Sequence, residues 1–89
     1  MEDLRGKNAI VTGASHGVGV HIAHALASEG VHLVLAARST GQLTDVAEQM
    51  RQLGVQAVDV RADVTRAADR AAIVAAAEQH LGPIHILVN

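Results

Sequence analysis

The sequence predicts an α/β domain in which helices cover both faces of a parallel sheet. Three observations support this fold class. Short apolar runs rich in Val and Ile alternate with longer segments of helical periodicity, the connections between them are short, and 89 residues suffice for one domain at most. Such alternation favours right-handed crossovers between parallel strands. We therefore expect one doubly wound unit over residues 1–89.

Four apolar runs are the expected strands. Residues 8–12 and 31–37 are apolar on both faces, which is typical of strands buried in a parallel sheet. Residues 55–60 and 84–88 form a third and a fourth strand. If the sheet ended at the fourth strand, that strand would be an exposed apolar edge, and we would expect it to promote aggregation.

Three segments between these strands carry apolar residues at three- and four-residue spacing, which predicts amphipathic helices. The first covers residues 17–29, the second runs from residue 39 or 40 to residue 54, and the third covers residues 65–81. Thr65 is the expected N-cap of the third helix. Because the chain contains no Phe, Tyr or Trp, we expect an aliphatic core.

Composition and charge exclude several classes of partner. The net charge of −2 gives no electrostatic reason to expect nucleic acid or a membrane surface as a partner. The chain has no cysteine, no basic and apolar leader at its start, and no apolar run near the ~20 residues that span a bilayer. We therefore expect a cytoplasmic protein. His21 and His24 are one helical turn apart but lack a third ligand, so no metal site is predicted, and His32, His80 and His85 receive no predicted role.

A glycine-rich loop joins the first strand to the first helix. Gly13 permits a tight exit from the strand, Gly17 allows a ligand to approach the backbone, and Gly19 allows close helix packing. The free N–H groups at the start of the helix, with the positive end of its dipole behind them, form an anion site. We predict that the pyrophosphate of a dinucleotide binds to this loop, which consists of Gly13, Ala14, Ser15, His16, Gly17, Val18 and Gly19.

The end of the second strand indicates which dinucleotide binds. A carboxylate about 20 residues beyond the glycine loop would bind the ribose hydroxyls of NAD. Here the strand instead ends in Arg38 and Ser39. The guanidinium of Arg38 suits a 2′-phosphate, to which the Ser39 hydroxyl can add a donor. The sequence therefore favours NADP(H), with NAD as the alternative if Arg38 is only a solvated charge.

The order Thr-Gly-x-x-x-Gly-x-Gly over residues 12–19 resembles the short-chain dehydrogenase/reductase family. Three further segments resemble that family in the same order: residues 4–7, residues 63–65 and residues 86–89. The resemblance covers nearly the whole chain. It implies a Rossmann-like sheet with the strand order 3-2-1-4 and helices on both faces, of which this chain would be a truncated part.

The resemblance also implies roles for individual residues. Asp63 and Val64 would border the adenine, although Asp63 also suits a turn before a helix, and both interpretations can hold together. His16 stands where NADP-binding members often carry Arg. It departs from the pattern, but a bound phosphate would favour its charged form.

The family transfers hydride between a nicotinamide and a carbonyl or alcohol substrate, with proton chemistry from a Ser, a Tyr and a Lys that lie beyond this segment. This chain contains no Tyr, and its one Lys is Lys7, so no catalytic residue is assigned. We expect a partial sequence: an NAD(P)-binding half-domain, incomplete at its C-terminus, of a longer enzyme that forms homo-oligomers. The alternative is a non-enzymatic NADP(H)-binding or interaction module.

Overall fold

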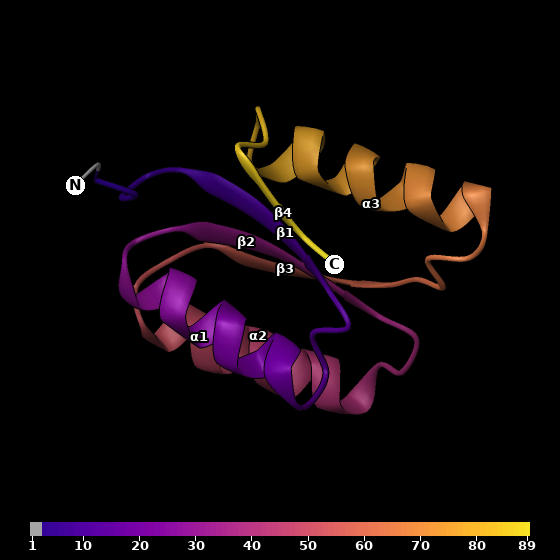
Figure 1. The fold of residues 1–89 in the computed structure, drawn as a ribbon, viewed down its shortest axis with the longest axis horizontal. Helices are drawn as coiled ribbons and strands as arrows, with labels where there is room; N and C mark the ends of the chain where they lie inside the picture. Colours follow the sequence, from indigo (N-terminus) through magenta and orange to yellow (C-terminus); the bar gives the residue numbers. More distant parts are fainter. Residues whose placement is uncertain (1–2) are drawn as a thin grey trace.

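A four-stranded parallel sheet forms the centre of the structure, a computed structural model that describes residues 3–89. The strands are β1 (Asn8–Thr12), β2 (His32–Ala37), β3 (Ala57–Arg61) and β4 (Ile86–Val88), in the order β3-β2-β1-β4. The helices are α1 (Val18–Ser28), α2 (Gly41–Gln52) and α3 (Ala67–His80). Figure 1 shows α1 and α2 on one face of the sheet and α3 on the other. The predicted fold class and strand order are confirmed.

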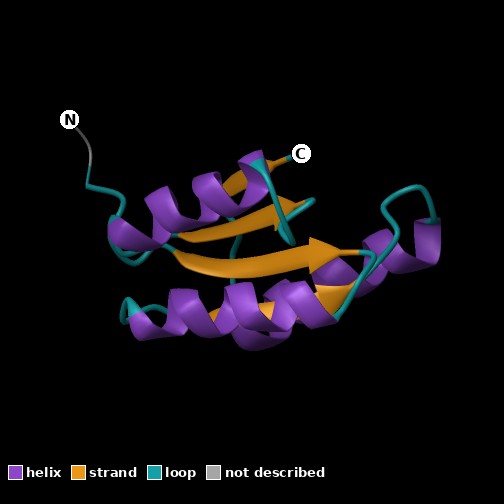
Figure 2. Cartoon of the chain, turned by 90° about the horizontal axis from the view of Figure 1, so that it is seen from below, coloured by secondary structure: helices purple, strands orange, loops and turns teal. Residues whose placement is uncertain are grey.

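Alternating residues of the central strands supply the cores of both layers, because successive side chains of a strand point to opposite faces. In β1, Ala9 and Val11 belong to the larger core, under α1 and α2, whereas Ile10 belongs to the smaller core under α3. Figure 2 shows α1 and α2 side by side across the larger core. The expected aliphatic core is confirmed: its largest fully buried side chains are Leu33, Leu35, Leu43, Met50, Val11, Val31 and Val34.

Several predicted boundaries differ from the structure by one or two residues. β3 begins at Ala57 and extends to Arg61, and β4 begins at Ile86. The predicted capping role of Thr65 is wrong: the N-cap of α3 is Arg66, and the Thr65 hydroxyl instead donates to the Asp63 carboxylate at 2.6 Å. This bond holds Thr65 in the turn that precedes the helix.

Two histidines without a predicted role join the strands near their amino ends. The Nδ1 atom of His85 accepts a hydrogen bond from the backbone N–H of Asn8 at 3.0 Å, and that of His32 accepts one from Gln56 at 3.0 Å. The buried Asn8 side chain donates to the carbonyl oxygens of Leu81 and Pro83 at 3.1 and 2.9 Å. The bonds of Asn8 hold the segment before β4 against the start of β1, and the bond of His32 joins the start of β2 to the residue before β3.

The fourth strand forms one edge of the sheet described over residues 3–89, since it pairs with β1 alone. Ile86 and Val88 pack against the larger core, and Ile84 packs against the smaller one. Leu87, which is paired in register with Ile10, remains 62% exposed. The expected apolar exposure at this edge therefore falls mainly on Leu87, and aggregation there stays a prediction.

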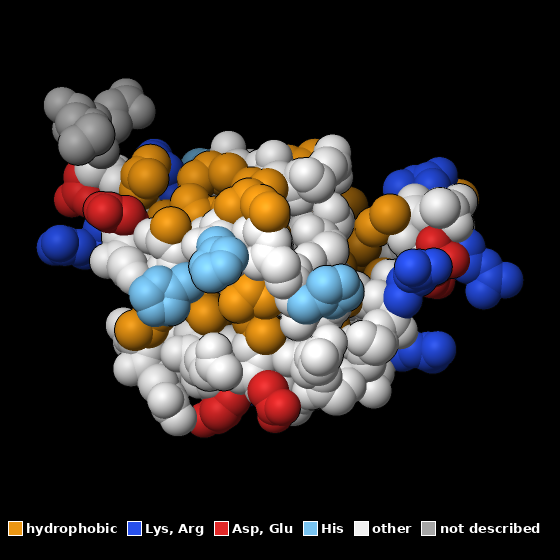
Figure 3. Space-filling model, turned by 60° about the horizontal axis from the view of Figure 1, so that its bottom comes forward, with side chains coloured by type: hydrophobic (Ala, Val, Ile, Leu, Met, Phe, Trp, Pro, Cys, Tyr) orange, Lys and Arg blue, Asp and Glu red, His pale blue; other side chains and the backbone are white. Residues whose placement is uncertain are grey.

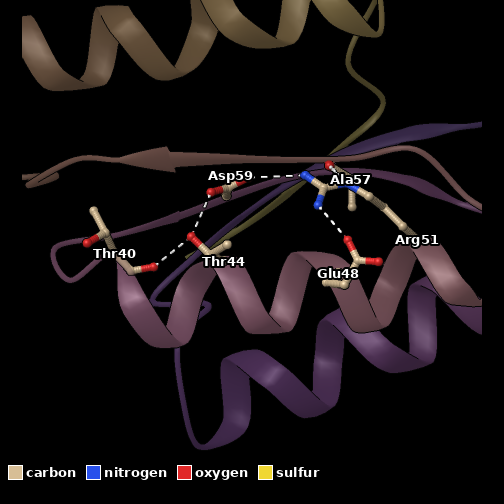
Figure 4. A network of polar contacts seen from close by, with 6 residues as sticks. All are labelled: Thr40, Thr44, Glu48, Arg51, Ala57 and Asp59. Atoms are coloured by element: carbon tan, nitrogen blue, oxygen red, sulfur yellow. Dashed lines mark hydrogen bonds and ion pairs between the residues drawn. The ribbon is translucent and has the colours of Figure 1, made fainter.

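Arg51 on α2 connects that helix to β3, the strand at the other edge (Figure 4). Its Nε donates to the carbonyl oxygen of Ala57 at 2.9 Å, and its two terminal nitrogens contact Asp59 and Glu48 at 3.2 Å. Thr44 donates to the second oxygen of Asp59 at 3.2 Å. The network fixes α2 over this edge strand and engages one of its backbone carbonyls, that of Ala57.

Within residues 3–89, no helix has both the length and the apolar character needed to cross a membrane. Nor do three or more histidine or carboxylate side chains of this described part gather as a metal site would require.

We predict that Arg51→Ala lowers the free energy of unfolding by about 1–2 kcal/mol, because it leaves the Ala57 carbonyl and the Asp59 carboxylate without this donor. Glu48→Ala is the matched control, since it removes only the exposed i,i+3 ion pair, which we expect to contribute about 0.5 kcal/mol or less. Urea unfolding of both variants measures the difference. Equal losses would show that the bonds to β3 add nothing beyond the surface pair.

Candidate functional site

A cleft of about 780 Å³ lies at the carboxyl ends of β1, β2 and β3. Ends of parallel strands meet at the same edge of a sheet, so residues far apart in the sequence converge there. The volume is within the range of small-molecule and cofactor sites. The cleft is lined by Gly13, Ser15, His16, Ala36, Ala37, Arg38, Ser39, Ala62, Asp63, Val64 and Thr65.

The structure brings most of the predicted cofactor-binding residues to this cleft. The predicted residues that line it are Gly13, Ser15, His16, Arg38, Ser39, Asp63 and Val64. Gly17, Val18 and Gly19 lie beside it, at the N-cap and in the first turn of α1. Ala14 is buried and its N–H donates to the carbonyl of Ala36 at 3.1 Å, so this residue fastens the loop to the end of β2.

Four lining residues were not among the predicted ones: Ala36, Ala37, Ala62 and Thr65. The three Ala side chains at the strand ends give no chemical signal in a sequence, and Thr65 was expected to cap the third helix. Their position next to Arg38 and Asp63 in the sequence could have indicated that they line the cleft, since neighbours of a strand-end residue share its surroundings.

The backbone of the glycine loop prepares a site for an anion. Gly17 is the N-cap of α1 with φ +65°, a left-handed conformation that suits glycine, and nothing lies within 4 Å of where its Cβ would be. In the described chain, no side chain caps α1 and its first turn contains no acidic residue. The first N–H groups of the helix are therefore without intrahelical or capping partners, and the positive end of the dipole is not compensated.

Gly19 permits a very close approach between α1 and the loop. A Cβ at this position would overlap the carbonyl oxygen of Gly13 and lie 2.9 Å from the carbonyl carbon of that residue. The obstacle is backbone, which cannot rotate away as a flexible side chain can. Gly19 is thus required by packing of the helix against the turn that follows β1.

Ser15 and His16 form one wall of the cleft. The Ser15 hydroxyl is 2.9 Å from Nδ1 of His16, with Ser15 buried and His16 exposed. Which of the two atoms donates depends on the tautomer of the imidazole. The contact orients the His16 ring beside the loop that would hold a pyrophosphate.

Arg38 and Ser39 are exposed at the end of β2. Among residues 3–89, no side chain forms a hydrogen bond or salt bridge with the Arg38 guanidinium. Its backbone carbonyl accepts a hydrogen bond from Nε of Arg61 at 3.1 Å. The one carboxylate that lines the cleft is that of Asp63, which comes from the loop after β3.

Asp63 organises the turn before α3. One oxygen of its carboxylate accepts hydrogen bonds from the Thr65 hydroxyl at 2.6 Å and from the Thr65 N–H at 2.9 Å. These two bonds, with smaller contributions from the positive charges of Arg38 and Arg66, lower the pKa of Asp63 below the ordinary value of 3.8. The prediction of a turn role is therefore confirmed, and contact with adenine stays a prediction.

The sequence model of the short chain dehydrogenase family matches residues 7–89. This chain belongs to the short-chain dehydrogenase family. It is 44% identical to 11-beta-hydroxysteroid dehydrogenase A of Sesamum indicum over 99% of the chain, which is 26% of that relative. The resemblance stated from the motifs is thereby confirmed.

Solved structures of the family share the fold. A short-chain dehydrogenase/reductase from Burkholderia phymatum in complex with NAD superposes with a TM-score of 0.92, 37% identity, and coverage of 98% of this chain and 31% of that one. L-sorbose reductase from Gluconobacter frateurii, complexed with NADPH and L-sorbose, superposes with a TM-score of 0.92 and 36% identity. The match covers 99% of this chain and 35% of that one. The chain thus spans about a third or less of the length of the first relatives it matches.

We predict that Gly19→Ala lowers the free energy of unfolding by about 1–3 kcal/mol, because the added methyl group forces α1 away from the Gly13 carbonyl. Gly41→Ala is the matched control: nothing lies within 4 Å of its Cβ, and we expect unchanged or slightly increased stability. Chemical denaturation measures both. A neutral Gly19→Ala would contradict the close packing of α1 on the loop.

We also predict that Thr65→Ala raises the pKa of Asp63 towards 3.8, since it removes the largest cause of the lowered value. A carboxyl group with a lowered pKa stabilises the folded turn at pH values above its ordinary pKa. This contribution is lost as the pH falls through the lowered pKa. NMR titration of the carboxyl carbon measures the shift, with Thr40→Ala as the control. An unchanged Asp63 pKa in Thr65→Ala would contradict the assignment.

Proposed function

We propose that this chain is the cofactor-binding N-terminal half-domain of an NADP(H)-dependent oxidoreductase that transfers hydride between the nicotinamide and a carbonyl or alcohol substrate. Its own part is the site for the adenosine and the pyrophosphate. The observation that carries the proposal is the cleft at the strand ends, where Arg38 has no partner among residues 3–89 and no carboxylate ends β2.

The glycine loop fits a pyrophosphate. Gly17 leaves open space above the backbone, and the uncapped first turn of α1 supplies N–H donors with a favourable dipole. Side chains that could block the approach are absent at Gly13, Gly17 and Gly19. NAD and NADP contain the same pyrophosphate, so the loop supports binding of a dinucleotide but does not distinguish between the two.

Arg38 and Ser39 support the choice of NADP(H), whereas His16 departs from the Arg that NADP-binding members of the family often carry. A guanidinium presents a rigid fork of donors that matches phosphate oxygens. A charge-assisted hydrogen bond contributes roughly 1.5–3 kcal/mol, which corresponds to about ten- to a hundredfold in affinity. NAD remains the alternative, since the Burkholderia phymatum structure holds NAD and the Gluconobacter frateurii structure holds NADPH.

Asp63 and Val64 would border the adenine. Val64 is 44% exposed at the cleft and offers apolar area for the ring. The Asp63 carboxylate, held ionised by Thr65, can accept from the exocyclic amine. In the proposal, adenine lies at the end of β3, ribose at the end of β2 and pyrophosphate at the end of β1.

When bound, the nicotinamide would donate or accept the hydride. The residues of this chain bind and orient the cofactor, and we assign none of them to proton transfer, since the sequence has no Tyr and a single Lys, Lys7. In the proposal, the substrate site lies outside these residues, and the whole enzyme is a cytoplasmic homo-oligomer. A non-enzymatic NADP(H)-binding module is the alternative that the lack of a Tyr keeps open.

The proposal predicts that this chain binds NADPH more tightly than NADH. Arg38→Asp should weaken NADPH binding by about ten- to a hundredfold and strengthen NADH binding, because a carboxylate repels the 2′-phosphate and accepts from ribose hydroxyls. Calorimetric titration of both nucleotides measures the change. Arg5→Asp, the same charge change near the amino ends of the strands, is the control and should alter neither affinity.

Two results would contradict the proposal. Absence of saturable binding by the cooperatively folded chain would remove the nucleotide site. Equal affinity of the unmodified chain for NADPH and NADH, unaffected by Arg38→Asp, would keep the site but remove the preference for NADP(H).

A further inference from the structure

A smaller pocket of about 310 Å³ opens beside the cofactor cleft. It shares Arg38, Ala62 and Asp63 with the cleft, so the two cavities adjoin. Its remaining lining consists of charged side chains: Arg61, Arg66 and Asp69. Figure 3 shows basic side chains gathered at the right end of the molecule, where the strands end, with carboxylates among them.

Arg61 reaches this pocket from the last position of β3. It is paired in register with Ala37, the last residue of β2, and its Nε donates to the carbonyl oxygen of Arg38 at 3.1 Å. The bond fixes the backbone of Arg38 at the point where the chain leaves the sheet. Within residues 3–89, the two terminal nitrogens of the Arg61 guanidinium form no hydrogen bond or salt bridge.

The two carboxylates of the pocket are engaged by the protein itself. Asp63 accepts from the hydroxyl and the N–H of Thr65, and Asp69 accepts from the N–H of Asp63 at 2.8 Å. The lining thus contains three guanidinium groups against two carboxylates, and one oxygen of each carboxylate already accepts hydrogen bonds within the turn before α3. The excess of positive charge with free donors suits an anion with several oxygens.

We propose that Arg61 is a second determinant of the preference for NADP(H): its Nε holds the backbone of Arg38, and its terminal nitrogens face the pocket that receives the 2′-phosphate. The inference rests on the proposed function, because it assumes that adenosine binds in the adjoining cleft. It adds that the phosphate contacts two guanidinium groups from neighbouring strand ends rather than Arg38 alone.

The geometry gives Arg61 two separable effects. As a positioning residue it limits the directions in which Arg38 can leave the end of β2, and as a ligand it supplies its own charge. Arg61→Lys keeps the charge but loses the fixed fork that lets Nε bind the Arg38 carbonyl while the terminal nitrogens reach the pocket. Arg61→Gln removes the charge and the fork together.

The test compares two probes that differ by one phosphate, adenosine 2′,5′-bisphosphate and adenosine 5′-monophosphate. In calorimetric titrations of the unmodified chain, the bisphosphate should bind more tightly. Arg61→Gln should lower the affinity for the bisphosphate by about tenfold and change that for the monophosphate less than twofold. Arg61→Lys should give an intermediate loss, and Arg5→Gln, near the amino ends of the strands, should give none.

A role confined to fold stability would affect both probes alike, so an equal loss for both in Arg61→Lys would overturn the inference, as would no loss in Arg61→Gln. If the unmodified chain prefers the bisphosphate and only Arg38 substitutions remove the preference, this inference fails while the proposed function stands. If the unmodified chain binds the two probes equally, the preference for NADP(H) and this inference fail together. If it binds neither probe, the nucleotide site itself fails.

Discussion

The close contact between Gly19 in the first turn of α1 and the carbonyl of Gly13 determines how the rest of the site is built. A methyl group on Gly19 would overlap that carbonyl, so the helix can start this near the end of β1 only with glycine there. Because α1 starts at this point, its uncapped N–H groups lie beside the ends of the parallel strands. The same approach lets Ala23 and Ala27 pack against the sheet, which connects the predicted anion site to the larger core.

The apolar sheet explains why the polar chemistry lies at its ends. Every residue of β2 after His32 is buried, so the first position where a charge can reach water is Arg38, just beyond the strand. β3 ends in a charged residue, Arg61, and the turn that follows contains Asp63. Parallel pairing then brings these residues to one edge with the glycine loop. The burial of the strands and the assembly of the cleft thus both follow from apolar strands that have charged residues at or just beyond their carboxyl ends.

The sequence predicts what depends on periodicity and on glycine, and it misses what depends on individual side-chain contacts. The strand order and the placement of Arg38 at the cleft follow from apolar runs and motif spacing. Thr65 has the residue type of an N-cap, but its hydroxyl donates to the Asp63 carboxylate and the N-cap is the next residue, Arg66. The acceptor roles of His32 and His85 depend on backbone groups of other strands, and nothing local in the sequence reveals them. Arg61 gives no signal either, because its contact with Arg38 exists only after β2 and β3 pair.

We expect a dinucleotide to bind across the carboxyl ends of β1, β2 and β3. Amide NMR of the isotope-labelled chain during titration with NADPH tests it most directly, since each backbone N–H reports on its own surroundings. We expect saturable shifts at Gly13, Ser15, His16, Arg38 and Val64, which line the cleft, and none at Gly30, Gly54 and Val55, which line a pocket near the amino ends of the strands. Shifts confined to the amino-end residues, or no saturable shift in a folded chain, would contradict the account.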